Sequence, residues 1–262
     1  MLSKMKIKEA LKLNNYSLAA EVLLCFVLKK DKTWLLSHPY DILTSDQTRR
    51  YQKLIFRRQK GEPVAYLINH KEFFGLDFYV DESVLIPRPE TEILIEEGLK
   101  ILKFKNLKIL DLGTGSGNIV ISLAKNIKAN FYASDISQKA LKIAQKNAKR
   151  HKVKIKFIKS DLFANMSHIK FNLIIANLPY LWKKFPKFEP ATALNGGKNG
   201  LEIIEKFLCQ VKKYLDIKSV ILIEIDPRQT KQIKELSKKY LPEKKIKIKK
   251  DLADLDRIAI IS

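Results

Sequence analysis

The sequence predicts an α/β fold in which a mostly parallel sheet carries helices on both faces, and three observations support this. From Leu107 onward, short apolar runs rich in β-branched residues alternate with stretches of helical periodicity. A glycine-rich segment stands directly between the first apolar run and the first helical stretch. The chain ends in two strand-like runs with only a short segment between them. We therefore expect a parallel sheet with one antiparallel terminal strand.

The expected elements follow one another in strict rotation. Strands are expected at residues 108–112, 130–134, 154–159, 171–176 and 219–225. Helices are expected at residues 118–126, 138–151, 201–215 and 229–240. The terminal strand pair is expected at residues 245–249 and 257–261. Such a rotation of strands and helices implies that helices cover both faces of the sheet.

The earlier part of the chain has a different pattern. Apolar side chains such as Leu18, Val22 and Phe26 recur at helical spacing. After residue 71, apolar and other residues alternate around Gly75, as in a short β-hairpin. The expected division is a helical domain at residues 1–71, a hairpin linker at 72–85 and the α/β domain at 86–262.

Composition narrows the class of protein. Hydrophobic residues make up 46% of the 262 residues and charged residues 30%, which is typical of globular chains. No apolar run approaches the roughly 20 residues that span a bilayer. Residues 1–12 lack the continuous apolar segment of a signal peptide. We expect a soluble, cytoplasmic, monomeric protein without a membrane partner.

The formal net charge is +22. The positive residues are mostly lysines scattered through the expected helices, as at Lys139, Lys142 and Lys146. This distribution is typical of solvated helix faces, since phosphate-binding grooves concentrate arginine and aromatic residues. We expect at most weak, nonspecific association with RNA or ribosomes.

No metal site is expected. The histidines share no spacing with other candidate ligands; they are His38, His70, His151 and His168.

The glycine-rich segment has the sequence expected of a cofactor loop. Its residues are Gly113, Thr114, Gly115, Ser116 and Gly117. Glycines lack a Cβ and tolerate positive φ, so a ligand can approach the backbone N–H groups at the helix start. Asp135 ends the next expected strand, where a carboxylate can accept both hydroxyls of a ribose. These features predict a cofactor that carries a nucleoside.

The glycine spacing favours one cofactor class. A nicotinamide dinucleotide loop has the pattern G-x-G-x-x-G, whereas Gly113, Gly115 and Gly117 are evenly spaced after Asp111. This favours S-adenosylmethionine. Residues 161–163, after the third strand, are the candidate wall for its adenine. The alternative is a structural turn that binds no ligand.

The tetrapeptide Asn177-Leu178-Pro179-Tyr180 follows the fourth expected strand. Its position is the carboxyl edge, where open α/β sheets bind ligands. The Asn177 side-chain oxygen and the Leu178 carbonyl can each accept one N–H of a planar amide or amine group. That arrangement turns the nitrogen toward a methyl donor, and the Tyr180 ring is expected to pack on the flat face of the group. The alternative is a simple Asn-x-Pro turn.

With these motifs the sequence resembles the bacterial release-factor glutamine methyltransferases, whose tetrapeptide is Asn-Pro-Pro-Tyr. The resemblance covers nearly the whole chain and is most distinctive in the linker. The matching segments are residues 31–36, 61–66, 72–75, 85–92, 109–117, 135–137, 177–180, 189–190, 197–204 and 256–257.

The resemblance implies a class I methyltransferase fold, which is Rossmann-like, with a helical N-terminal domain that helps to recognise the release factor. It implies methyl transfer from S-adenosylmethionine to the glutamine of a Gly-Gly-Gln motif, a modification linked to translation termination. The implied cofactor contacts are Gly113, Thr114, Gly115, Ser116, Gly117, Asp135, Leu162 and Asn177. The implied catalytic and substrate contacts are Asn177, Leu178, Pro179 and Tyr180.

A substrate role is also expected for Pro87, Arg88 and Pro89. Read from the residues alone, they form a stiff, extended element before a helix near Glu90, which could simply terminate the hairpin.

Two positions depart from the family pattern. Leu178 replaces a proline, which keeps the backbone carbonyl but loses a φ restraint worth about 0.4–1 kcal/mol. Leu162 stands where an aromatic residue is usual in the adenine wall. Neither change touches the expected acceptors.

Other functions stay open from the sequence alone. The same tetrapeptide can hold the amino group of adenine, so an adenine-N6 nucleic-acid methyltransferase is one alternative. A glutamine methyltransferase that acts on a ribosomal protein is another. A third is a non-catalytic RNA- or ribosome-binding protein that retains a methyltransferase fold.

Overall fold

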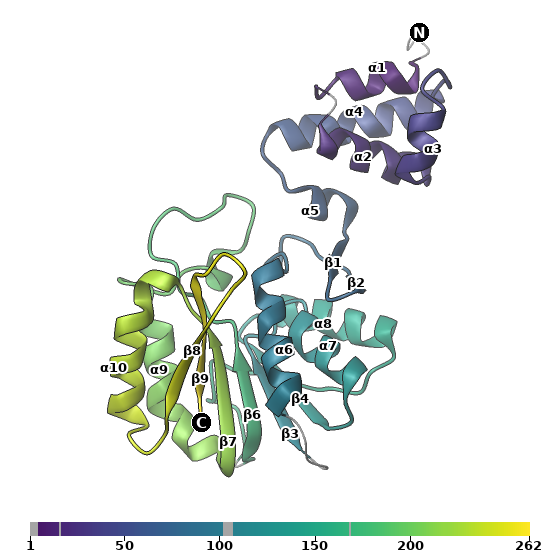
Figure 1. The fold of residues 1–262 in the computed structure, drawn as a ribbon. Coiled ribbons are helices and arrows are strands. Elements are labelled where there is room, and N and C mark those ends of the chain that lie inside the picture. The colour runs from purple at the N-terminus through teal and green to yellow at the C-terminus, as the bar shows by residue number, and fades with distance from the viewer. Residues whose placement is uncertain (1–4, 16, 102–106, 168) are drawn as a thin grey trace. The chain divides into compact units, whose positions relative to one another are not determined.

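The computed structural model describes residues 5–15, 17–101, 107–167 and 169–262. The chain divides into two compact units, Met1–His70 and Lys71–Ser262 (Figure 1). The hairpin that the sequence predicts as a linker belongs to the second unit. His168 lies outside the described residues.

The first unit is helical, as predicted. Ser17 caps the second helix and Thr44 caps the fourth, each accepting a hydrogen bond from a backbone N–H of the first turn. Apolar faces of the helices enclose a core in which Leu23 and Tyr51 are fully buried. The helices are α1 (Ile7–Lys12), α2 (Leu18–Leu28), α3 (Lys32–Ser37), α4 (Ser45–Gln59) and α5 (Val64–Ile68).

The second unit contains a hairpin and a large sheet. Strands β1 (Lys71–Phe73) and β2 (Leu76–Phe78) pair antiparallel around Phe74 and Gly75. The large sheet has the order β5-β4-β3-β6-β7-β9-β8. Its strands are β3 (Lys108–Leu112), β4 (Asn130–Asp135), β5 (Lys156–Lys159), β6 (Phe171–Ala176), β7 (Leu215–Glu224), β8 (Ile246–Lys250) and β9 (Asp256–Ile261).

Strands β3 to β7 run parallel, and β9 runs antiparallel to both β7 and β8. The expected parallel sheet with one antiparallel terminal strand is therefore confirmed. Strand β7 begins earlier than expected because Leu215 pairs with Phe171 before a shift in register. The preceding helix accordingly ends at Val211, and the chain passes through a short 3₁₀ turn into the strand.

Helices cover both faces of this sheet (Figure 1). Helices α6, α7 and α8 lie on one side, and α9 and α10 pack together on the other. The α-helices are α6 (Glu92–Ile101), α7 (Asn118–Asn126), α8 (Gln138–His151), α9 (Glu202–Val211) and α10 (Thr230–Tyr240). The 3₁₀ helices are η1 (Pro89–Thr91), η2 (Ala191–Ala193), η3 (Lys212–Tyr214) and η4 (Pro227–Gln229).

The strand order places a topological switch between β3 and β6. The chain leaves β3 for β4 on one side and returns to β6 on the other. In open α/β sheets, ligands bind at the carboxyl ends of the strands that flank such a switch. Separately, none of the helices in the described part of the chain combines the length and apolar character needed to cross a membrane.

Candidate active site

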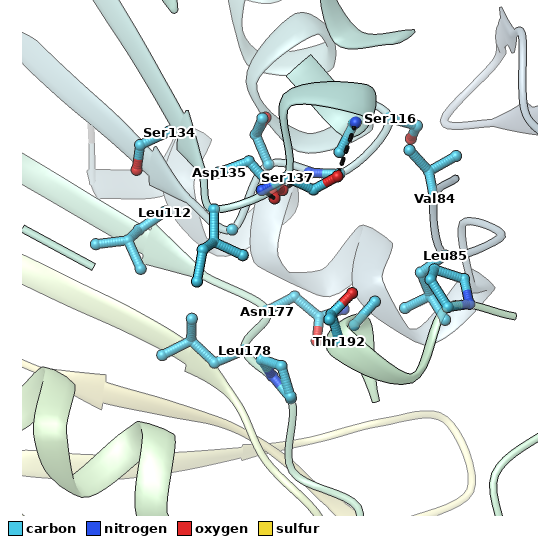
Figure 2. A pocket seen from close by; sticks show the side chains of 18 of the residues that line it. Val84, Leu85, Leu112, Ser116, Ser134, Asp135, Ser137, Asn177, Leu178 and Thr192 are labelled. Atoms are coloured by element: carbon cyan, nitrogen blue, oxygen red, sulfur yellow. Dashed lines mark hydrogen bonds between the residues drawn. The ribbon is translucent and has the colours of Figure 1, made fainter. Parts of the chain in front are cut away.

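A cavity of about 420 Å³ lies at the carboxyl ends of β3 to β6, a size typical of small-ligand sites (Figure 2). The sequence-predicted residues that line it are Pro87, Arg88, Gly113, Thr114, Gly115, Ser116, Asp135, Leu162, Asn177, Leu178 and Pro179. Three predicted residues do not line it: Pro89, Gly117 and Tyr180. Residues distant in sequence thus meet at the edge that the fold predicts.

The glycine loop bends tightly between β3 and α7. The backbone N–H groups of Gly113 and Thr114 both donate to the Ser134 carbonyl at 2.9 Å. Gly113, Gly115 and Gly117 have φ values of +79°, +53° and +81°, which other residues rarely adopt. A Cβ at Gly117 would lie 2.9 Å from the Ile121 side chain, so Gly117 serves the packing of α7 rather than the cavity wall.

Asp135, the last residue of β4, connects that strand to the glycine loop by hydrogen bonds. Its Oδ2 accepts from the Gly115 N–H at 2.9 Å, and its Oδ1 accepts from the Ser137 N–H at 2.8 Å. Burial raises the pKa of Asp135, and these backbone hydrogen bonds oppose the rise. Each carboxylate oxygen keeps a second lone pair, so the group can still accept a hydroxyl from a ligand in the cavity.

Asp111 lies buried beneath the same loop. Its Oδ2 accepts from the Thr114 hydroxyl at 2.7 Å and from the Val120 N–H at 3.3 Å. Its Oδ1 has no hydrogen-bond partner among the described residues, and burial raises the pKa of Asp111 to about 7. No role for this residue is predicted from the sequence, although an acidic residue inside the apolar run Ile-Leu-Asp-Leu indicates a buried carboxylate.

The cavity wall that follows β5 is aliphatic. Leu162 is buried, lines the cavity and has a φ of +46°, a conformation that is strained for leucine. Ile136 and Ala140 line the same cavity, and none of the described residues that line it is aromatic. A planar ring bound here would therefore pack on aliphatic side chains rather than stack on an aromatic one.

Asn177 follows β6 and is held by two side chains that the sequence does not predict at the site. Its Nδ2 lies 3.0 Å from Glu224 Oε2 and 3.2 Å from Thr91 Oγ1. The Thr91 hydroxyl in turn donates to Glu224 Oε2 at 2.7 Å. Glu224 is a nearly fully buried acid at the end of β7.

Tyr180 belongs to the same network. Its hydroxyl donates to Glu224 Oε1 at 3.0 Å, and burial raises the pKa of Tyr180, so the phenol keeps its proton at neutral pH. The predicted packing of the Tyr180 ring on a substrate amide stays a prediction.

The cofactor loop and the tetrapeptide lie close together at one cavity. A Cβ built on Gly113 would lie 3.5 Å from Leu178 Cδ2 and 3.7 Å from the Asn177 carbonyl oxygen. Figure 2 shows Asn177 and Leu178 across the cavity from Asp135 and Ser137. The two motifs therefore border one space.

The segment that follows Tyr180 completes the cavity wall. Its lining residues are Pro190, Ala191, Thr192, Ala193 and Asn195. Glu189, just before them, pairs with Arg88 of the Pro-Arg-Pro element. The Arg88 guanidinium is thus engaged within the protein.

These residues fit a cofactor that combines a ribose with a planar base. The glycine loop lines the cavity and leaves open space beside Gly115, Asp135 supplies a hydroxyl acceptor, and Leu162 contributes an aliphatic wall. Of the described residues, no group of three or more histidine, cysteine or acidic side chains could hold a metal ion.

Comparison with known proteins identifies the relatives of the chain. A family model described as a methyltransferase domain matches residues 103–255, and one described as the PrmC N-terminal domain matches residues 6–68. The chain is 39% identical over 254 residues to the release factor glutamine methyltransferase of Buchnera aphidicola subsp. Baizongia pistaciae, covering 93% of this chain and 91% of that protein. It is 44% identical over 210 residues to the protein of the same name from Dictyoglomus turgidum, covering 75% and 73%.

The solved structures agree on the fold. A methyltransferase from Pyrococcus furiosus superposes with a TM-score of 0.57 at 20% identity, covering 80% of this chain and 95% of that one. The expected class I methyltransferase fold is therefore confirmed. Since the chain covers 91% and 73% of these two relatives at 39% and 44% identity, it belongs to the release factor glutamine methyltransferase family.

Proposed function

We propose that this protein transfers a methyl group from S-adenosylmethionine to the side-chain amide nitrogen of the glutamine in the Gly-Gly-Gln motif of a peptide chain release factor. Membership in the family supports the reaction class. The observation that carries the proposal is that Gly113 of the cofactor loop and Leu178 of the tetrapeptide line one cavity. A methyl donor and an amide can share the space that these motifs border.

The cofactor would be held by the glycine loop, Asp135 and Leu162. S-adenosylmethionine, when bound, supplies an electrophilic methyl group on a sulfonium centre. Asp135 would accept ribose hydroxyls, and it also accepts a hydrogen bond from the Gly115 N–H. Asp111 joins the loop to α7, since it accepts hydrogen bonds from Thr114 and Val120.

The amide nitrogen of glutamine is a weak nucleophile because its lone pair is delocalised into the carbonyl. Asn177 Oδ1 and the Leu178 carbonyl would each accept one of its N–H groups, which turns the nitrogen toward the methyl donor. The two oxygens would stabilise the positive charge that develops on this nitrogen during methyl transfer without reorganising, and the proton that the nitrogen loses would pass to solvent.

The leucine at position 178 is compatible with this mechanism. Its carbonyl remains available as an acceptor, and its side chain is buried against Gly113. Packing can thus replace part of the restraint that a proline ring would supply.

Several finer expectations stay predictions. They are recognition of the release factor by the helical domain of residues 1–71, the linker role of residues 72–85, substrate contacts by Pro87, Arg88 and Pro89, a monomeric state, a cytoplasmic location and weak RNA association.

Mass spectrometry tests the reaction directly. A purified release factor is incubated with the enzyme and cofactor, and the peptide that contains Gly-Gly-Gln is analysed. We expect one added methyl group on the glutamine, and none on a release factor whose glutamine is replaced by alanine. Transfer only to DNA, RNA or a ribosomal protein would contradict the proposal.

A further inference from the structure

Glu224 is the centre of a buried hydrogen-bond network behind the tetrapeptide. The residue is 2% exposed, and its carboxylate accepts from three side chains. They are the Thr91 hydroxyl at 2.7 Å, Asn177 Nδ2 at 3.0 Å and the Tyr180 hydroxyl at 3.0 Å. The donors come from two segments: Thr91 ends η1, and Asn177 and Tyr180 belong to the tetrapeptide after β6. Glu224 itself does not line the cavity.

The chemistry of the carboxylate fixes which end of the Asn177 side chain faces it. An ionised carboxylate can only accept hydrogen bonds, so the asparagine must present its nitrogen to Glu224. The Thr91 hydroxyl gives its proton to Glu224, so its oxygen is free to accept from Asn177. Asn177 Nδ2 therefore donates to two acceptors, Glu224 Oε2 and Thr91 Oγ1.

The opposite end of the same side chain is the oxygen. Asn177 lines the cavity, and no hydrogen bond among the described residues uses its Oδ1. Because a carboxamide carries its oxygen and nitrogen on one planar carbon, occupation of the nitrogen by Glu224 and Thr91 directs the oxygen elsewhere.

We propose that Glu224 is a positioning residue that fixes the orientation of the Asn177 carboxamide, so that the active site offers an acceptor and not a donor to the reacting nitrogen. This inference rests on the proposed function, in which the substrate presents N–H groups. In the reversed orientation, Nδ2 would face those N–H groups donor to donor. The substrate amide would lose one of its two acceptors, and its nitrogen would not be turned toward the methyl donor.

The size of the effect follows from the hydrogen bonds that distinguish the two orientations. The oxygen and nitrogen of a carboxamide are nearly the same size, so packing hardly discriminates between them. A hydrogen bond to an ionised acceptor favours the correct orientation by on the order of 10- to 100-fold. A single buried carboxylate is therefore sufficient to orient the acceptor.

Burial is the largest influence on the pKa of Glu224, and neighbouring groups offset part of it. Burial raises the pKa of Glu224, and the charge of Glu90 acts in the same direction. The hydrogen bonds from Thr91 and Tyr180 and the positive charge of Arg257 lower the pKa and oppose that rise. Arg257 is itself held by Asp251, whose Oδ2 accepts from Nε at 3.1 Å and from Nη2 at 3.0 Å.

Substitutions at Glu224 test the role by kinetics. Glu224→Leu removes every acceptor at similar volume, and we expect kcat for release factor to fall about 10- to 100-fold. The Kd for S-adenosylmethionine should change by less than about threefold, since Glu224 does not line the cavity. Glu224→Gln keeps one carbonyl acceptor, so we expect its kcat to lie between those of Glu224→Leu and the wild type. This variant also tests the role if Glu224→Leu does not fold.

Ile223→Val is the matched control. Ile223 is fully buried on the same strand, so the variant reports the cost of disturbed packing beside Glu224. We expect its kcat to match the wild type. A Glu224→Leu enzyme with the kcat of the control would overturn the inference.

A second readout is independent of turnover. The side-chain amide signal of Asn177 in a ¹H–¹⁵N spectrum is assigned by its loss in Asn177→Asp. In the wild type we expect slow exchange of these protons with solvent, because both partners are buried acceptors, and fast exchange in Glu224→Leu. An identical signal in both proteins would contradict the inference. If the signal depends on Glu224 but the wild type does not methylate release factor, the positioning role stands and the proposed function fails.

Discussion

Arg88 donates through one guanidinium nitrogen to both carboxylate oxygens of Glu189, at 2.7 and 2.6 Å. The Glu189 side chain is 2% exposed, whereas that of Arg88 is 41% exposed. The pair joins the Pro-Arg-Pro element to the segment that carries Pro190 and Ala191, and both parts line the cavity. It therefore holds two walls of the active site together.

We expect Arg88→Ala to lower the free energy of unfolding by about 1–3 kcal/mol, since it leaves a buried carboxylate without its partner. This expected loss of stability is smaller than for a fully buried ion pair because the Arg88 side chain is partly solvated. Glu189→Ala should cost less, and the double variant should cost less than the sum of the two. Urea unfolding of the four proteins measures this coupling. Additivity within about 0.5 kcal/mol would show that the two side chains are independent.

The kinetics of the same four proteins examine the predicted substrate role of Arg88. If Arg88 acts only through Glu189, its removal should not lower kcat/KM further once Glu189 is alanine. An additional loss of tenfold or so in that background would instead indicate a direct contact with the release factor.

Asn177→Ala should separate binding from chemistry. The variant loses an acceptor that matters most when charge develops on the substrate nitrogen, so we expect kcat to fall about 10²- to 10³-fold. The Kd for S-adenosylmethionine should stay within about threefold of the wild type. Steady-state methyl transfer and calorimetric titration provide the two values. Parallel losses in both would assign Asn177 to the cofactor instead.

Asp135→Ala should show the opposite pattern. It removes the candidate ribose acceptor and releases Gly115 of the cofactor loop, so we expect the Kd for S-adenosylmethionine to rise about 10- to 100-fold. At saturating cofactor, kcat should recover most of its wild-type value. Calorimetry with an unchanged Kd would exclude Asp135 from the cofactor site.

The fold was largely predictable because it depends on patterns within short segments. Apolar runs and helical periodicity located the strands and helices from residue 107 onward, and all of the expected strands are present. The start of β7 was not predictable, since Leu215 joins the strand through its pairing with Phe171. Such pairing is a tertiary interaction, and it overrides the polar character of Asp216 and Lys218.

The candidate site was predictable only for residues in motifs that directly follow a predicted strand. The glycine loop and Asp135 come together because both follow parallel strands, and Asn177 joins them for the same reason. Glu224 was not predictable, because its hydrogen bond to Thr91 joins residues 133 positions apart. Nothing local in the sequence indicates which donors a buried acid will meet.

Gly200→Ala should be far more harmful than Gly75→Ala. The two glycines have similar positive φ, +72° and +67°, so the backbone strain is matched at about 1–2 kcal/mol. A Cβ at Gly200 would overlap the Tyr180 carbonyl oxygen and lie 2.5 Å from Gln229 Nε2, whereas nothing lies within 4 Å of a Cβ at Gly75. We expect Gly200→Ala to lose at least about 3 kcal/mol of stability. Equal melting temperatures would contradict the close packing at Gly200.

Asp111 should make the stability of the cofactor-free protein depend on pH. Its pKa is raised from an ordinary value of 3.8 to about 7 by burial, so between these values the folded protein holds a proton that the unfolded chain releases. Stability from this group is therefore present at low pH and lost as pH rises toward about 7, by up to about 4 kcal/mol. Asp111→Asn removes the titration and keeps an acceptor for Thr114 and Val120. Relative to this variant, the wild type should be more stable at about pH 5 than at about pH 8 in urea unfolding. A difference between the two proteins that is constant over this range would show that Asp111 is ionised throughout, and that the glycine loop tolerates a buried charge without a partner at Oδ1.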